Sequence, residues 1–155
     1  MLTLRRRSSS EAVAPSSSRS RPVLLATLDV PFDDEATAFA VDSAVENGQP
    51  LVVVNAAEVL PTVYAFLGYG YVERDELQAE LLKPAELAQS LAVRVERLRV
   101  CSPHPVDALL EVTAERNAAV LVFGPDRRHL PGRRYRRAER AVRERATCLV
   151  WAPDD

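Results

Sequence analysis

Short, continuous apolar runs are the feature that most narrows the folds open to this sequence. Each is six residues long, contains no charged side chain and lacks strict alternation of polar and apolar residues. Such runs are typical of strands buried on both faces, as in a parallel sheet covered by helices. Three of these runs are predicted as buried strands: VLLATL (23–28), LVVVNA (51–56) and AVLVFG (119–124). The fourth, TCLVWA (147–152), is predicted as the last strand.

Amphipathic segments separate these runs. A first helix is predicted from Asp33, whose carboxylate can cap free N–H groups, to Asn47, where Gly48 can take the left-handed conformation of a helix end. A second is predicted over residues 73–92, with Pro84 expected to kink or split it. VERLRVC (95–101) alternates apolar residues with arginines, which favours a strand at an edge or solvated on one face.

Two further helices complete the pattern. One begins at Pro105, which suits a first helical turn, and the other carries Tyr135, Ala138 and Val142 on one stripe. Five strands therefore alternate with four helices. This order predicts an α/β fold in which right-handed crossovers join a parallel sheet that helices cover on both faces.

Composition divides the chain into a tail and one domain. Residues 1–21 are rich in Ser and Arg and cannot bury enough apolar surface to fold, so we expect a disordered tail. Residues 22–155 are expected to form a single domain. The sequence contains no apolar run long enough to cross a membrane and no secretion signal, which favours a cytoplasmic protein. Its two cysteines lack a metal-binding pattern and are expected to be buried thiols.

Charge is unevenly distributed along the chain. Residues 22–123 contain six basic and 16 acidic residues, a net charge of −10, whereas residues 124–147 contain nine arginines and three acids, a net charge of +6. The arginine-rich part could attract nucleic-acid phosphates. The acidic remainder and the lack of aromatic residues among the arginines, apart from Tyr135, argue against nucleic acid as a partner.

Three stretches together resemble the universal stress protein family. They are VLLATLD (23–29), VDALLEVTAERNAAVLVFG (106–124) and RAVRERATCLVWAP (140–153). The similarity covers about residues 22–153. It implies the strand order 3-2-1-4-5, a Rossmann-like fold, a homodimer and, in one branch of the family, a bound adenine nucleotide such as ATP.

The resemblance also implies a ligand site at the carboxyl ends of the central strands. Asp29 matches the aspartate that contacts the nucleotide, and Ala56 lies near the backbone position that contacts adenine. Gly124 matches the first glycine of the family motif G-2x-G-9x-G-(S/T), whose backbone N–H groups wrap the phosphates.

The rest of that motif is replaced by larger residues. Counting forward from Gly124 puts Arg127 at the second glycine and Arg137 and Ala138 at the final pair. Counting back from the last strand puts Arg136 and Arg137 at the final pair instead. Gly132 is expected to form a tight turn with Pro131. Two consequences are possible: the phosphate site is closed, or guanidinium groups have replaced the backbone N–H groups as phosphate ligands.

The function predicted from the sequence is therefore a non-catalytic regulatory or stress-response module with a degenerate nucleotide loop. The alternative is an adenine-nucleotide sensor that uses arginines. No catalytic or metal-ligating residue is predicted. The last strand (147–152) is an apolar edge without charge, which predicts a homodimer through it. The aromatic residues of 57–72 are expected to close over the ligand crevice or to pack down.

Overall fold

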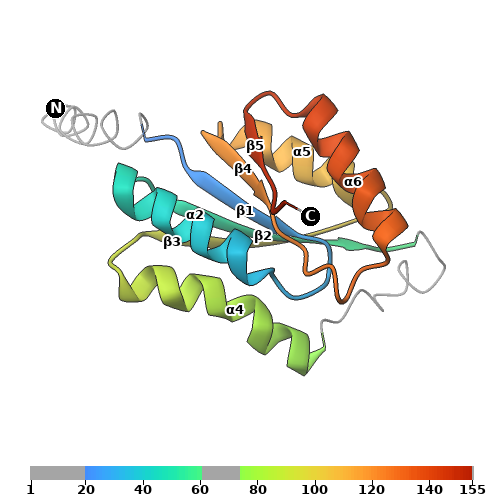
Figure 1. Ribbon diagram of the computed structural model, residues 1–155, viewed down its shortest axis with the longest axis horizontal. Helices are drawn as coiled ribbons and strands as arrows, with labels where there is room; N and C mark the ends of the chain where they lie inside the picture. The colour runs from blue at the N-terminus through green and yellow to red at the C-terminus, as the bar shows by residue number, and fades with distance from the viewer. Residues whose placement is uncertain (1–19, 61–73, 155) are drawn as a thin grey trace, which may run out of the picture.

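The computed structural model describes residues 20–60 and 74–154. These residues form a five-stranded parallel sheet in the order β3-β2-β1-β4-β5, as predicted. Figure 1 shows the sheet between two layers of helices. The strands are β1 (Val23–Thr27), β2 (Leu51–Glu58), β3 (Val95–Ser102), β4 (Val120–Phe123) and β5 (Leu149–Trp151); the helices are α2 (Asp34–Asn47), α4 (Asp75–Ser90), α5 (Pro105–Glu115) and α6 (Gly132–Arg145).

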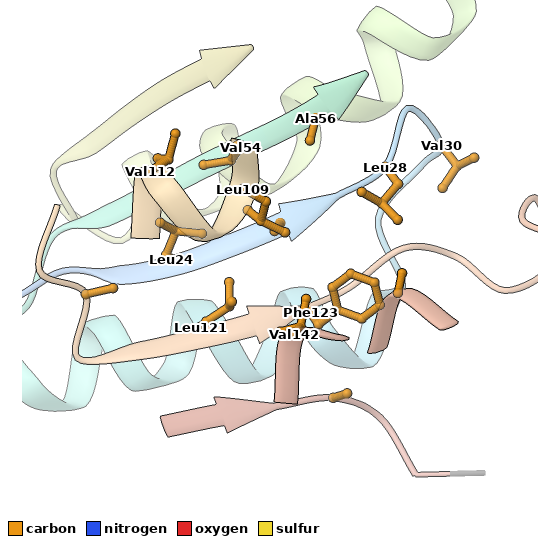
Figure 2. Packing of buried hydrophobic residues seen from close by; sticks show 14 of the residues in the cluster. Leu24, Leu28, Val30, Val54, Ala56, Leu109, Val112, Leu121, Phe123 and Val142 are labelled. Carbon is orange, nitrogen blue, oxygen red and sulfur yellow. The ribbon is translucent and has the colours of Figure 1, made fainter. Parts of the chain in front are cut away.

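Two hydrophobic clusters hold the layers together. One packs α5 and α6 onto the sheet around Leu24, Leu109 and Phe123, and Figure 2 shows these side chains meeting between the strands and the helices. The other packs α2 and α4 against the opposite face. β1 is fully buried because strands flank it on both sides and helices cover both faces. The apolar runs of β1, β2 and β4 therefore lie in buried strands, as predicted, whereas β5 is an edge strand on which Leu149 is exposed.

Several helix boundaries follow from local chemistry. The carboxylate of Asp33 accepts a hydrogen bond from the Ala36 N–H at 2.9 Å, which caps α2 as predicted. Gly48 ends that helix with a φ of 63°, a conformation that glycine adopts without steric cost. Pro105 is in the first turn of α5, also as predicted.

Some expectations were wrong in whole or in part. Of the two effects predicted for Pro84, a kink or a split, the split does not occur: α4 continues from Asp75 to Ser90, because buried residues on both sides of the proline hold the helix on the sheet. The thiols are not buried: Cys101 is exposed on the edge strand β3, and Cys148 is half-buried. β5 contains three residues, fewer than the six predicted.

Two predicted segments lie wholly or partly outside the described residues. Of the predicted tail, only residues 20 and 21 are described, and the Arg21 side chain donates hydrogen bonds to the carbonyls of Asn117 and Ala118 at 3.2 and 2.9 Å. Of the predicted aromatic loop, residues 57 and 58 belong to β2, and residues 61–72 lie outside the described part of the chain.

Candidate functional site

The topological switch point lies between β1 and β4, the two central strands that pair in parallel. From β1 the chain winds toward β2, and from β4 toward β5, so the loops leaving these two strands diverge and open a crevice. A cavity of about 420 Å³ is found there. Its lining comprises Leu28, Asp29, Val30, Glu58, Leu60, His129, Leu130, Pro131 and Arg134.

Asp29 is held at the mouth of this cavity by its own backbone. Its φ is 60°, in the left-handed region that aspartate tolerates better than most residues. The Asp29 N–H donates to the Asn55 side-chain oxygen at 2.7 Å, and the Thr27 hydroxyl donates to the Val30 carbonyl at 2.7 Å. The turn after β1 is therefore fixed by side chains from β1 and β2, and it keeps the half-buried Asp29 in the lining of the cavity.

Ala56 and Gly124 lie close to the switch point but do not line the cavity. Ala56 is in β2 and is buried in the hydrophobic cluster below it. Gly124 follows β4, and a Cβ atom there would come within 2.7 Å of the Ala36 Cβ and 3.1 Å of a Leu25 methyl carbon. Its N–H donates to the Ala26 carbonyl and its carbonyl accepts from the Asp33 N–H, each at 2.8 Å. Gly124 is thus a close-packing residue whose backbone N–H and carbonyl are both engaged within the fold.

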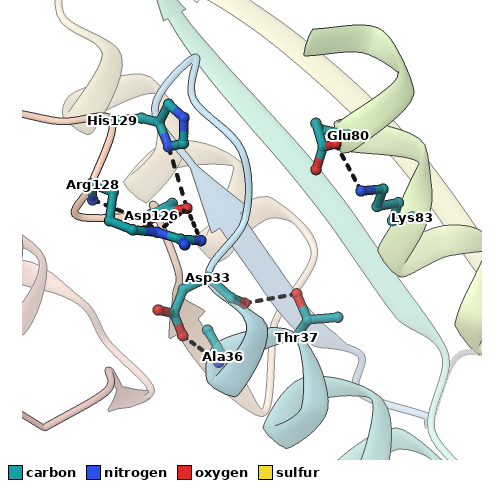
Figure 3. Close-up of polar contacts among 8 residues, drawn as sticks. All are labelled: Asp33, Ala36, Thr37, Glu80, Lys83, Asp126, Arg128 and His129. Carbon is teal, nitrogen blue, oxygen red and sulfur yellow. Dashed lines mark hydrogen bonds and ion pairs between the residues drawn. The ribbon is translucent and has the colours of Figure 1, made fainter. Parts of the chain in front are cut away.

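Asp126 organises the loop between β4 and α6. Its side chain is only 6% exposed. The carboxylate accepts a hydrogen bond from the Arg128 N–H at 2.9 Å, and the Arg128 guanidinium donates to both of its oxygens, the shortest contact being 2.8 Å. The His129 Nδ1 lies 3.3 Å from the same carboxylate. Figure 3 shows both side chains converging on Asp126.

These contacts have an electrostatic consequence. Hydrogen bonding from Arg128 is the main cause that lowers the pKa of the Asp126 carboxyl, and it outweighs the opposing effect of burial. Two further backbone N–H groups of the loop are occupied by carbonyls: that of Asp126 donates to the Pro31 carbonyl at 2.9 Å, and that of His129 to the Asp126 carbonyl at 3.0 Å. The Asp126 carboxylate therefore takes the Arg128 N–H, and backbone carbonyls take the N–H groups of Asp126 and His129.

Arg127, at the position of the second motif glycine, extends toward the end of the chain. Its guanidinium donates to the Pro153 carbonyl at 2.8 Å and lies 4.5 Å from the centre of the Tyr135 ring. Tyr135 is buried against Phe123, and burial is the main cause that raises the pKa of its hydroxyl. Arg127 thus packs α6 and the chain end together and is not among the residues that line the cavity.

The remaining motif positions lie in α6. The tight turn predicted for Gly132 with Pro131 is wrong: Pro131 is the N-cap of α6 and Gly132 is the first residue of the helix. Arg136 and Arg137 are in the second turn, with exposed side chains. Backbone N–H groups beyond the first turn of an α-helix bond to carbonyls four residues earlier. The backbone of Arg136 and Arg137 therefore cannot wrap a phosphate, and only their side chains remain available to a ligand.

An ion pair spans the crevice. Glu58, at the end of β2, and Arg134, in the first turn of α6, are 3.4 Å apart, and both line the cavity. The sequence did not predict Glu58, Arg134, His129 or Asn55 as site residues. Glu58 could have been found as the charged residue that ends a buried strand, but its partner lies 76 positions away along the chain. Among the described residues, no group of three or more metal-binding side chains comes together.

The cavity and strand order define a doubly wound α/β domain with a crevice at its switch point, the class of fold in which ligands bind at the carboxyl ends of the strands. A model of the universal stress protein family matches residues 19–152, and the chain belongs to this family. No helix in the described residues has the length and apolar character of a membrane span.

Solved structures share this fold. A universal stress protein from Archaeoglobus fulgidus is 18% identical, with a TM-score of 0.61 over 85% of this chain and 92% of that one. One from the same organism in complex with dAMP is 20% identical, with a TM-score of 0.60 over 85% and 96%. A family protein from Arabidopsis thaliana with AMP bound is 13% identical, with a TM-score of 0.51 over 85% and 90%. The comparison with curated proteins found no match.

Proposed function

We propose that this protein is a non-catalytic regulatory module of the universal stress protein family whose phosphate loop is closed to ATP. The observation that carries the proposal is the buried Asp126 carboxylate, which takes the Arg128 N–H and guanidinium that an incoming phosphate would otherwise recruit. An anion already bound to these donors repels a second anion. A phosphate would have to displace the carboxylate and leave it unpaired in a buried place.

The crevice adds two further obstacles to a triphosphate. Asp29 and Glu58 contribute two carboxylates to its lining. Arg134, a cation at the start of α6, is paired with Glu58 at 3.4 Å. Relatives with dAMP and AMP bound show that nucleotides occupy some members of the family. In this chain the crevice is lined by the carboxylates of Asp29 and Glu58 and by one guanidinium, that of Arg134, which is paired with Glu58. The charge of the lining is therefore acidic on balance.

The absence of catalysis is part of the proposal. The titratable side chains that line the cavity are Asp29, Glu58, His129 and Arg134. Glu58 and Arg134 pair with each other, and His129 contacts Asp126. A hydrolase or transferase would need a nucleophile with a base within hydrogen-bond reach. The cavity lining contains neither a serine nor a cysteine.

The alternative function is an adenine-nucleotide sensor in which arginine side chains bind the phosphates. It is favoured by the position of Arg134 at the cavity and by the exposed side chains of Arg136 and Arg137 one turn further along α6. Arg127 does not support it, because the Pro153 carbonyl and the Tyr135 ring occupy its guanidinium.

We also propose a homodimer through the last strand. β5 is an edge of the sheet, and Leu149 on it is 75% exposed. An uncharged edge strand with exposed apolar side chains pairs readily with another strand. A second copy aligned along β5 would cover both the unpaired backbone and Leu149. The cytoplasmic location expected from the sequence stays a prediction.

Calorimetric titration with ATP, ADP and AMP separates the two functions. The closed loop predicts no saturable binding at micromolar concentrations, either for the wild type or for an Arg136→Gly/Arg137→Ser double variant. Micromolar ATP binding by the wild type that is lost in the double variant would support the sensor and contradict the closed loop.

A further inference from the structure

Helix α6 presents two faces of opposite character. Tyr135, Ala138 and Val142 are buried against the sheet and α5. Seven of the 14 residues of the helix are arginines, and all seven lie outside this buried stripe. The helix lies on the outside of the molecule, next to α5 (Figure 1). Its arginines therefore line an exposed surface.

Four of these arginines lack an acidic partner among the described residues. Arg134, Arg143 and Arg145 pair with Glu58, Glu139 and Asp107, respectively. The remaining four are exposed and form no ion pair within residues 20–60 and 74–154. We call this set the arginine flank; it consists of Arg133, Arg136, Arg137 and Arg140.

The arginine flank is unfavourable for the isolated helix. Arg133 and Arg137 are four positions apart, as are Arg136 and Arg140, and like charges at this spacing repel each other. The first turn of α6 contains no acidic residue, whereas the helix dipole favours negative charge at this end. Packing of the buried stripe holds the helix in place despite this repulsion. An anionic partner would relieve it.

A groove adjoins the arginine flank between α5 and α6. Its volume is about 340 Å³, and Arg137 reaches into its lining together with Arg134 and Arg145. Apolar atoms of Leu28, Val106, Ala138 and Ala141 also line it. The lining also contains two ion pairs, Arg134 with Glu58 and Arg145 with Asp107. The groove thus combines apolar side chains with one arginine, Arg137, that forms no ion pair with any other described residue.

We propose that the arginine flank and this groove bind an acidic peptide segment of a partner protein. An apolar side chain of the segment fills the groove, and its carboxylates pair with Arg137 and the other guanidiniums of the flank. Guanidinium binds carboxylate through two parallel hydrogen bonds, which favours arginine over lysine at such surfaces. The partner gives the proposed regulatory module its target, so this inference rests on that proposed function.

Three observations favour a peptide over nucleic acid. The groove has an apolar lining that a sugar-phosphate backbone cannot fill. Tyr135, the one aromatic residue of α6, is buried and cannot stack on a base. Residues 22–123 contain 16 acidic and six basic residues, so a long polyanion that extends beyond α6 meets repulsion.

Selection from a displayed library of random twelve-residue peptides on the full chain tests the proposal. We expect the enriched peptides to combine several Asp or Glu residues with at least one large apolar residue. The best of them is then labelled and titrated by fluorescence anisotropy. Its affinity should fall as salt is raised, because the contacting charges are exposed. A version with the apolar residue replaced by serine should bind at least about fivefold more weakly, since burial of the apolar side chain is lost.

Variants locate the binding surface. Arg137→Glu should weaken binding of the labelled peptide at least about tenfold, because it replaces an attractive charge with a repulsive one at the groove. Arg97→Glu is the matched control: it makes the same charge change at an exposed arginine of β3, and binding should change less than about twofold. Circular dichroism and thermal melting of both variants establish that each is folded.

Three results would overturn the proposal. The enriched peptides could lack acidic residues, the two variants could weaken binding equally, or a single-stranded oligonucleotide of the same net charge could bind more tightly than the peptide. Nucleotide titration, which tests the closed loop, uses a different ligand and different variants. Failure of one proposal is thus distinguishable from failure of the other.

Discussion

Gly124→Ala tests whether the first glycine of the family motif serves packing. The new Cβ would lie 2.7 Å from the Ala36 Cβ and 3.1 Å from a Leu25 methyl carbon. Ordinary carbon contacts are about 3.5–4.0 Å, so the overlap with Ala36 is roughly 1 Å. Ala36 is fully buried in the first turn of α2 and cannot rotate away. Relief requires a shift of the helix, and overpacking of this kind costs about 1–3 kcal/mol.

The assay is urea unfolding followed by circular dichroism, with the free energy of unfolding taken from the linear extrapolation. Gly132→Ala is the matched control. There the new Cβ meets only the flexible end of Arg136, at 3.2 Å, and alanine suits the first turn of a helix. The control should be neutral or more stable by up to about 1 kcal/mol. The packing argument is refuted if Gly124→Ala changes the free energy of unfolding by less than about 0.5 kcal/mol.

The remaining predictions concern the loop, the strand edge and a helix end. Asp126→Ala should lower the free energy of unfolding by about 1–3 kcal/mol, since it removes the acceptor of several hydrogen bonds in a buried place. The pKa of Asp126 is lowered on folding. Its contribution to the free energy of unfolding is therefore fully present above 3.8, the ordinary aspartate pKa, and is lost as the pH falls through the lower folded pKa. In urea unfolding, the difference in free energy of unfolding between wild type and variant should be smaller at pH 3 than at pH 7. Leu149→Arg should convert the proposed dimer into a monomer in light scattering at micromolar concentration, and a wild type that is itself monomeric would contradict the dimer. Gly48→Ala, at a φ of 63° with open space around it, should cost about 1–2 kcal/mol through backbone strain alone, and an unchanged melting curve would count against that reason.

The strand positions could be predicted from the sequence because a strand buried on both faces requires apolar residues at consecutive positions. A strand such as β1 must be apolar at every position, and VLLAT meets that requirement without knowledge of its neighbours. The caps at Asp33 and Gly48 are equally local, since each acts on backbone groups a few residues away. The strand order and the family were predicted from the resemblance to universal stress proteins. Three sequence stretches carried that resemblance; each is weakly specific alone, but they occur in the correct order.

The site residues could not be predicted in the same way. The motif count placed Arg136 and Arg137 at the phosphates, but α6 begins at Gly132 and puts both in its second turn. Asp126 looks like an ordinary turn residue in the sequence. Its role depends on Arg128 and His129 folding back over it and on the Pro31 carbonyl from a distant loop. The Glu58 and Arg134 pair requires β2 and α6 to meet, which sequence spacing does not reveal.

The closed loop depends on the Asp126 carboxylate, which occupies the phosphate loop. NMR tests this directly: the amide chemical shifts of the full chain are followed while ATP is added up to millimolar concentration. We expect the amides of Arg128, His129 and Gly132 to stay unchanged, because the Arg128 N–H already donates to the Asp126 carboxylate and the His129 N–H to the Asp126 carbonyl, which closes the loop to phosphate. Saturable shifts of these three amides with a midpoint at micromolar ATP would contradict the closed loop.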